Sequence, residues 1–268
     1  ALPEGISAFS DVTIDPTDDS KLFALSTNER RVCSFRFNSA TARLTLVNCV
    51  GGDIAVGPFT GVSAFGGSLI ISGGTGGFTV FSYNTSTGSI QVNPLNSRVL
   101  LPDVIGHPDV VLVNRNLAAL STDFSRNPNF GTMMVAGIRS SSPREVRDFR
   151  IDNNLGLDLA LGPTNFPLVN AVYRSAGRPP VMYTANGAVT AQNPLGNGSD
   201  RDLTNLLQSR SAQGIRAISC ATDAVGQHLV VGGQLLDRSS FVIQVFSIAN
   251  NPFSPVFVET RTVTGRLT

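Results

Sequence analysis

Thr79-Val-Phe-Ser-Tyr-Asn84 is a short run of alternating apolar and polar residues, and similar words recur along the chain. The related words are Val32–Asn38, Arg147–Asp152 and Ile243–Ile248, and they usually end at Asn or Asp. Alternation with a period of two is typical of a β-strand that buries one face. We therefore expect the third strand of a repeated unit at each of these positions.

Other words recur on both sides of this strand. Gly61-Val-Ser-Ala-Phe65 repeats Gly5-Ile-Ser-Ala-Phe9, and Gly214-Ile-Arg-Ala-Ile218 resembles both. A turn and a short apolar strand follow each of them, at Lys21–Ser26, Ser68–Gly74 and Gln227–Gly233. A turn and a fourth short strand are expected over Ser39–Leu46 and over Thr85–Val92. Each unit thus has four short strands joined by turn residues, which is the makeup of a propeller blade.

The sequence therefore predicts an all-β fold, a β-propeller of five four-stranded blades in a single domain. The predicted blades are residues 1–50, 51–103, 104–163, 164–213 and 214–268. In the fourth blade we expect the second strand at Pro179–Thr184, the third at Gly187–Ala191 and one helical turn at Asp202–Leu207. A β-sandwich or a jelly roll also has short strands at this spacing and remains the alternative, but the recurrence of similar words favours the propeller.

The composition agrees with a β fold and excludes several classes of protein. The chain of 268 residues has 19 Arg but one Lys and four Glu, and these last two types normally fill the exposed faces of helices. A net charge of +1 without a basic stripe argues against nucleic acid as a partner. Apolar runs such as Val110–Val113 are far shorter than the roughly 20 residues that span a bilayer, so an integral membrane protein is not expected.

The cysteines indicate an oxidising compartment. A hairpin between the alternating runs around Cys33 and Cys49 brings the two side chains close enough for a disulfide, with reduced cysteines as the alternative. Cys220 is expected to pack as a small hydrophobic residue. Glycosylation acceptors at Asn84 and Asn197 fall in predicted loops and agree with secretion. The start at Ala1 suggests a processed or trimmed chain, and the expected location is extracellular or in the lumen of an organelle.

Several residue groups could carry chemistry, and each has a simpler interpretation. His107 and His228 have no metal-ligand neighbour at a recognised spacing, so structural or surface roles are expected. Ser72-Gly-Gly-Thr-Gly-Gly77 lacks the Lys of a phosphate-binding loop and is expected to be a turn between strands. No Gly-x-Ser-x-Gly word is present to support a serine hydrolase. We therefore assign no catalytic residue, metal ligand or cofactor.

Two charged segments remain. Asp15, Asp18 and Asp19 could offer oxygen ligands to Ca²⁺, but the segment lacks the pattern of an EF-hand, and a solvated turn is expected. Charged residues alternate through Arg144–Arg150 so that both faces of a strand carry charge. This pattern favours an exposed outer strand, with a partner surface as the alternative.

The words Val80–Ile90 and Phe35–Leu44 resemble blades of the 6-phosphogluconolactonase-like β-propellers, and Val12–Phe23 is similar to the first-to-second strand turn of that family. The resemblance implies the propeller fold. Members of that family with lactonase activity usually have seven blades. Seven blades would leave fewer than 40 residues for each in this chain of 268 residues, which is less than the observed spacing of the repeats. No position here matches a catalytic motif of the family.

The sequence therefore favours a secreted or lumenal propeller without enzymatic activity. We expect it to bind another protein or to serve as a structural module of a larger extracellular assembly. The alternative is a lactonase-like hydrolase whose site lies in the central channel. A third reading is a filament or assembly in which the exposed edge of a blade pairs with another chain.

Overall fold

The structure is a computed structural model. It describes residues 2–51, 59–73, 77–99, 110–122, 131–138, 144–151, 168–173, 181–186, 188–192, 201–202, 215–223, 226–235, 237 and 240–263. The chain divides into two compact units, residues 1–152 and 153–268. All regular secondary structure in the described ranges is β, in five four-stranded antiparallel sheets.

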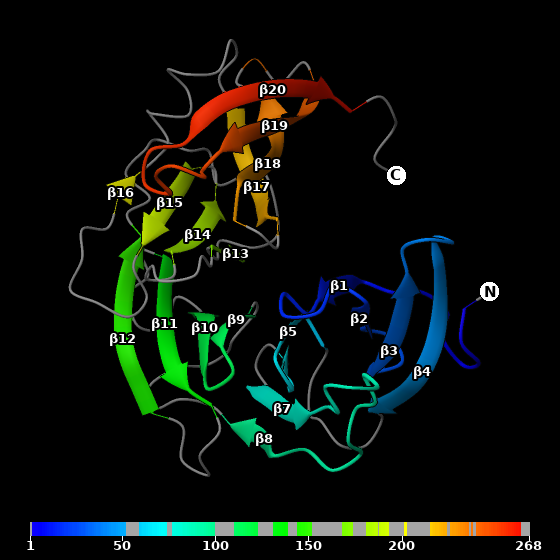
Figure 1. Ribbon diagram of the computed structural model, residues 1–268. Helices are drawn as coiled ribbons and strands as arrows, with labels where there is room; N and C mark the ends of the chain where they lie inside the picture. Colours follow the sequence, from blue (N-terminus) through cyan, green and yellow to red (C-terminus); the bar gives the residue numbers. More distant parts are fainter. Residues whose placement is uncertain are drawn as a thin grey trace. The chain divides into compact units, whose positions relative to one another are not determined.

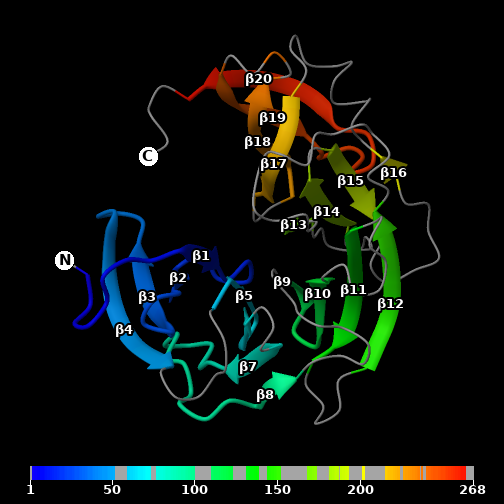
Figure 2. The ribbon, with the colours of Figure 1, turned by 180° about the vertical axis from the view of Figure 1, so that it is seen from behind.

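The first unit contains three sheets. Sheet 1 consists of β1 (Asp11–Ile14), β2 (Lys21–Ser26), β3 (Arg31–Asn38) and β4 (Arg43–Gly51). Sheet 2 consists of β5 (Gly61–Phe65), β6 (Ser68–Ser72), β7 (Phe78–Ser82) and β8 (Asn96–Val99). Sheet 3 consists of β9 (Val110–Asn114), β10 (Leu117–Thr122), β11 (Gly131–Gly137) and β12 (Arg144–Ile151). Within this unit β1 lies beside β5 and β5 beside β9, whereas β4 and β12 lie at the outside (Figures 1 and 2).

The second unit contains two sheets. Sheet 4 consists of β13 (Leu168–Tyr173), β14 (Val181–Asn186), β15 (Ala188–Gln192) and β16 (Arg201–Asp202). Sheet 5 consists of β17 (Ile215–Thr222), β18 (His228–Leu235), β19 (Phe241–Ser247) and β20 (Val256–Thr262). The first strand of sheet 5 lies beside β13 and β14 of sheet 4. Each sheet in both units therefore runs in chain order from its first strand to its fourth, which is the arrangement of a propeller blade.

Each pair of consecutive sheets in a unit encloses an apolar cluster. The cluster between sheets 1 and 2 includes Phe23, Phe59 and Phe81, and the cluster between sheets 2 and 3 includes Phe78. Phe246 belongs to the cluster between sheets 4 and 5. These rings are at most 1% exposed, so phenylalanine side chains fill the space between the sheets at these positions. Burial of a side chain of this size stabilises the fold by about 1.5–3 kcal/mol.

Most of the predicted strands are present. Strands β2 and β5 have the predicted bounds, β14 and β15 are the second and third strands of their sheet, and each sheet lies within one predicted blade to within a residue. The single domain over 1–268 stays a prediction. Asp202 ends β16, and the rest of the predicted helical turn lies outside the described residues.

Three predicted strands were wrong. Gly5–Phe9 precedes the sheet, because a turn forms where Ile6 N–H donates to Pro3 O and β1 begins only at Asp11. Thr85–Val92 contains the predicted turn but not the fourth strand, because Ile90 makes only one bridge, to Tyr83, and the fourth strand of sheet 2 begins at Asn96. Arg147–Asp152 was assigned to a third strand, but Arg144–Ile151 is the fourth strand of sheet 3, since three strands precede it.

Candidate functional site

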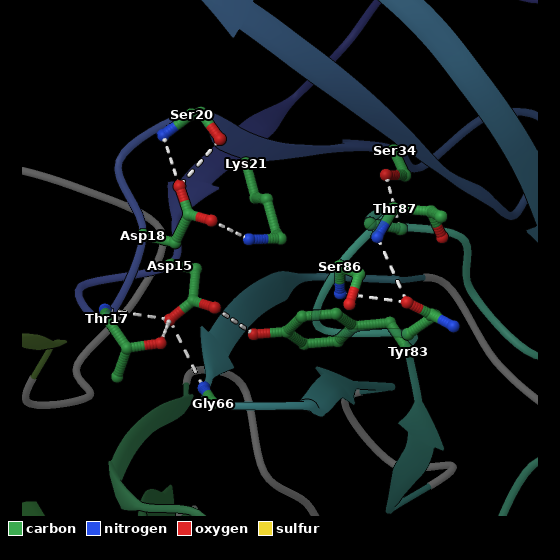
Figure 3. A network of polar contacts seen from close by, with 12 residues as sticks. Asp15, Thr17, Asp18, Ser20, Lys21, Ser34, Gly66, Tyr83, Ser86 and Thr87 are labelled. Atoms are coloured by element: carbon green, nitrogen blue, oxygen red, sulfur yellow. Dashed lines mark hydrogen bonds and ion pairs between the residues drawn. The ribbon is translucent and has the colours of Figure 1, made fainter.

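A network of polar contacts joins the turn between β1 and β2 to sheet 2 (Figure 3). At its centre the Asp15 carboxylate is 1% exposed. Its Oδ1 atom accepts hydrogen bonds from Thr17 N (2.9 Å), Thr17 Oγ1 (2.8 Å) and Gly66 N (3.2 Å). Its Oδ2 atom accepts a hydrogen bond of 2.5 Å from the Tyr83 hydroxyl. Buried carboxylates are costly unless hydrogen-bonded, and these four donors, two of them from sheet 2, offset that cost.

Tyr83 reaches Asp15 from the end of β7. Its ring packs at 4.7 Å between centroids from Phe23, which belongs to β2. Burial, together with the hydrogen bond to Asp15, raises the pKa of the Tyr83 phenol above its ordinary value of 10.0. The phenol therefore stays protonated at neutral pH and acts as a hydrogen-bond donor between the two sheets.

Lys21 is the one lysine of the sequence, and it is 1% exposed. Its Nζ atom forms an ion pair with Asp18, which also accepts hydrogen bonds from Ser20 N (3.1 Å) and Ser20 Oγ (2.6 Å). The bond from Lys21, followed by the Ser20 hydroxyl, lowers the pKa of Asp18 to about 2. The Asp18 side chain is 40% exposed, so solvent screens part of this attraction.

The turn between β7 and β8 covers this lysine. A Cβ atom at Gly88 would lie 3.7 Å from Lys21 Cγ and 3.2 Å from Ser34 Oγ, and Gly88 has φ +80°. The Ser34 hydroxyl donates to Gly88 O at 2.7 Å. The Asn48 amide donates to Ile90 O at 2.8 Å and accepts from Ile90 N at 3.0 Å. Side chains of β3 and β4 thus hold a turn of sheet 2 against sheet 1.

Similar polar links join neighbouring sheets elsewhere in the first unit. Asp11 Oδ2 accepts from Val62 N at 2.9 Å, and Ser63 Oγ accepts from Leu112 N at 2.9 Å. Burial raises the pKa of Asp11. In each link, a side chain on the first strand of one sheet accepts a hydrogen bond from the backbone of the first strand of the next sheet. These polar groups therefore hold neighbouring sheets in register. Their donors and acceptors are engaged by protein partners, which favours a structural role for the network.

The structure confirms the predicted disulfide between Cys33 and Cys49. The two residues are directly opposite each other on β3 and β4. Cys220 is 4% exposed within the cluster between sheets 4 and 5, as expected for a small hydrophobic residue. Asn84 lies exposed in the turn after β7, where its Oδ1 accepts from Ser86 N at 2.8 Å and Thr87 N at 3.0 Å. Asn197 and His107 lie outside the described residues.

The predicted role of His228 at the surface agrees with its position at the start of β18. Its side chain is 44% exposed, and its Nδ1 atom lies 3.1 Å from Asp223 Oδ2. Asp223 also accepts hydrogen bonds from the N–H groups of Gln227 and His228. Burial opposes ionisation of Asp223, but the hydrogen bonds outweigh it and lower its pKa. Asp223 thus stabilises the turn between β17 and β18 by capping its N–H groups.

The aspartate segment differs from the prediction. A solvated turn was expected, and Asp19 is exposed, but Asp15 is buried because sheet 2 covers it. No group of three His, Cys, Asp or Glu able to hold a metal ion occurs within the part of the chain that the structure describes. Gly73 and Gly77 lie between β6 and β7, and Gly73 N–H donates to Gly77 O at 2.7 Å, whereas residues 74–76 of the predicted turn lie outside the described residues. Arg144–Ile151 is an outer strand, as expected. In the described ranges, no helix is long and apolar enough to cross a membrane.

Sequence reasoning missed Lys21, Tyr83 and Asn48 as members of this network. A lone lysine beside three aspartates was a usable signal for an ion pair. Tyr83 gave none, because its partner Asp15 is 68 residues away in the sequence.

One face of sheet 1 is apolar. The strand register places Ile14, Leu22, Phe35 and Leu46 in one row across the sheet, with Phe37 opposite Leu44 in the next row. Large side chains of this face are exposed: Val12 by 57%, Ile14 by 50%, Phe37 by 38%, Leu44 by 53% and Leu46 by 45%. We call these five residues the sheet 1 apolar face. Grouped exposure of this kind marks interaction surfaces in many proteins.

Comparison with known proteins gives a likeness of fold. No family model matches the sequence, and no curated protein matches it. Among solved structures, the periplasmic gluconolactonase PpgL of Pseudomonas aeruginosa has a TM-score of 0.59 at 17% identity, covering 96% of this chain and 72% of that one.

Two further solved structures are similar in fold to a comparable degree. The nidogen/laminin complex gives a TM-score of 0.55 at 13% identity, with 94% and 79% covered. The Cps50 (Swd1) β-propeller domain of Myceliophteria thermophila gives 0.54 at 12% identity, with 95% and 72% covered. At such identities the likeness concerns the fold alone. Together with the chain-order sheets, it identifies the fold of this protein as a β-propeller that resembles the lactonase-type propellers.

Proposed function

We propose that this protein is a binding or structural module of an oxidising compartment, with a protein as its partner. The observation that carries this proposal is the sheet 1 apolar face, where five aliphatic and aromatic side chains are exposed together. Interfaces between proteins are built around such residues. The network around Asp15 supports the same role, because its charged groups hold two sheets together.

The disulfide supports the compartment. Cys33–Cys49 bridges two adjacent strands, and such bridges persist outside reducing compartments. Exposed Asn84 in its Asn-Thr-Ser triplet is the proposed glycan site that the structure describes. Expression in a secreting eukaryotic host should give a glycan mass that is lost in Asn84→Gln, apart from any glycan at Asn197. An unmodified Asn84 together with free Cys33 and Cys49 thiols would contradict the proposed location.

Substitution on the apolar face tests the binding role. The double variant Leu44→Glu/Leu46→Glu places charge on the face, and Val92→Glu, at a 64% exposed valine outside it, is the matched control. Tagged proteins are used to recover partners from the medium of the native host, and the affinity of a purified partner is then measured by calorimetry. We expect the control to bind like the wild type and the double variant to bind about tenfold or more weakly. Equal affinity of all three proteins would refute the role of this face.

A lactonase-like hydrolase is the second candidate, and the likeness to a periplasmic gluconolactonase is the observation that favours it. Its catalytic groups would come from several sheets. The test is the rate of gluconolactone hydrolysis followed by acid release. Hydrolysis proportional to enzyme concentration and above the buffer rate would establish this candidate, and a rate equal to buffer would remove it.

A further inference from the structure

The outer strands of three sheets share an irregularity. In β4, Leu46 pairs with Phe35 and Asn48 with Ser34, so Val47 is an extra residue without a partner in the register. In β20, Phe257 pairs with Phe246 and Glu259 with Val245, which leaves Val258 extra. In β12, Glu145 pairs with Ala136 and Arg147 with Val135, which leaves Val146 extra. Each outer strand longer than four residues therefore carries a one-residue bulge, within the described ranges.

The three bulges occupy one position of the repeat. A backbone hydrogen bond from the end of the third strand to the residue before the second strand provides a common reference point: Phe37 N–H donates to Ser20 O (2.7 Å), Ile138 to Asn116 O (2.9 Å) and Ile248 to Gln227 O (2.8 Å). The bulge lies opposite the residues two and three places before the donor in each case, and the extra residue is valine each time. Recurrence at one repeat position, in both compact units, indicates a feature of the blade itself.

In the described residues the other two outer strands are short, and the register of β8 against β7 also shifts, with one extra residue between Asn96 and Val99. The described part of β8 has four residues and that of β16 has two. Short edge strands and bulges are both means by which β-proteins prevent edge-to-edge pairing, because neither presents a regular row of N–H and C=O groups.

We propose that the recurrent valine bulge guards the outer edges of the sheets against strand addition by another chain. This inference goes beyond the proposed function and does not depend on it. It argues against the reading in which the protein assembles through paired blade edges, and it assigns partner binding to side-chain faces instead.

Strand β4 offers the sharpest test, because, of the three strands with a valine bulge, it has the fewest charged residues that could prevent another strand from pairing with its edge. Five of the eight residues of β12 are charged in the sequence, and β20 carries the ion pair between Glu259 and Arg261 at 2.8 Å. From Leu44 to Val50, β4 has no charged residue and no proline, so its bulge is the main guard in that stretch. Deletion of Val47 makes the pairing with β3 regular and keeps Cys49 opposite Cys33.

The experiment compares deletion of Val47 with deletion of Val258 and with Val47→Ala, which keeps the chain length and hence the bulge. Sedimentation velocity over a range of concentrations gives the association constant. We expect the Val47 deletion to raise the association constant about tenfold or more over the wild type. The Val258 deletion should raise it less than the Val47 deletion does, and Val47→Ala should not raise it at all. Adding Thr45→Lys to the Val47 deletion should restore the monomer, because Thr45 is exposed on the same strand and lysine protects edges.

Controls separate edge pairing from misfolding. An intact Cys33–Cys49 bridge, shown by mass spectrometry without reduction, together with an unchanged circular dichroism spectrum, shows that the deletion variant keeps its register. A folded Val47 deletion that associates no more than the wild type would overturn the proposal. If that variant does not fold, the Val258 deletion combined with Glu259→Thr and Arg261→Thr takes its place, and a folded protein without added association overturns the proposal equally.

Discussion

Replacing Tyr83 by phenylalanine should destabilise the first unit through a single lost hydrogen bond. The substitution keeps the ring and its packing against Phe23, and it removes the hydroxyl that donates to Asp15 Oδ2 at 2.5 Å. Asp15 is 1% exposed, so water cannot readily replace the lost donor. Three donors remain on Oδ1.

The expected magnitude follows from the charge of the acceptor. Hydrogen bonds to charged groups contribute about 1.5–3 kcal/mol, and those between neutral groups about 0.5–1.5 kcal/mol. Tyr183 is a matched control, because it is fully buried and its hydroxyl donates to a neutral acceptor, Pro252 O, at 2.6 Å. We therefore expect Tyr83→Phe to lower the free energy of unfolding more than Tyr183→Phe does.

Urea unfolding at pH 7, followed by far-ultraviolet circular dichroism, gives both values, and the slopes show whether each transition remains two-state. A double-mutant cycle with Asp15→Asn then isolates the coupling between the two side chains. If Tyr83→Phe costs less than about 0.5 kcal/mol, or no more than Tyr183→Phe, the reasoning that a buried charge makes this bond strong is wrong.

Three further predictions concern the same unit. Changing both Cys33 and Cys49 to serine should lower the free energy of unfolding by about 3 kcal/mol, the contribution expected from a bridge that closes a loop of this length. Thermal unfolding measures the change, and a transition unchanged from the wild type would contradict this prediction. Because the pKa of Tyr83 is raised in the fold, the unfolded chain loses that proton first above pH 10, so stability should fall with rising pH there, and less steeply in Tyr83→Phe. The pKa of Asp18, lowered from 3.8 to about 2, contributes stability above pH 4 that is lost as the pH falls to 2. Since Asp18 is partly exposed, that loss should be below about 1 kcal/mol and should disappear in Asp18→Asn, as urea titrations at several pH values can test.

The strand repeat could be predicted because it is local. Alternation and turn residues within words such as Lys21–Ser26 and Gly61–Phe65 define strands without knowledge of the rest of the chain. Likewise, the disulfide followed from two alternating runs joined by one hairpin. The prediction failed at Gly5–Phe9, which resembles β5 in sequence but does not form the first strand of its sheet. The next segment, Asp11–Ile14, pairs with β2 in its place.

The bonds of the network that link sheet 1 to sheet 2 could not be predicted, because they join residues that are distant in sequence. Asp15 was expected to be solvated on the grounds that aspartates in a turn normally are, and nothing nearby indicates that Gly66 and Tyr83 cover it. The valine bulges were also invisible to a pattern search. A bulge keeps the residue types of a strand and changes only the register, which two paired strands define together.

The burial of Lys21 makes the protein unusual towards chemical reagents. With no other lysine in the sequence, reagents directed at lysine amines meet a single target, and the turn from Asn84 to Ile90 covers it in the folded state. Lysine-directed cross-linkers and supports should therefore leave the native chain largely untouched at this side chain. The rate at which Lys21 is acylated therefore reports the rate at which sheets 1 and 2 open locally. Mass spectrometry of the one peptide that contains Lys21 measures it.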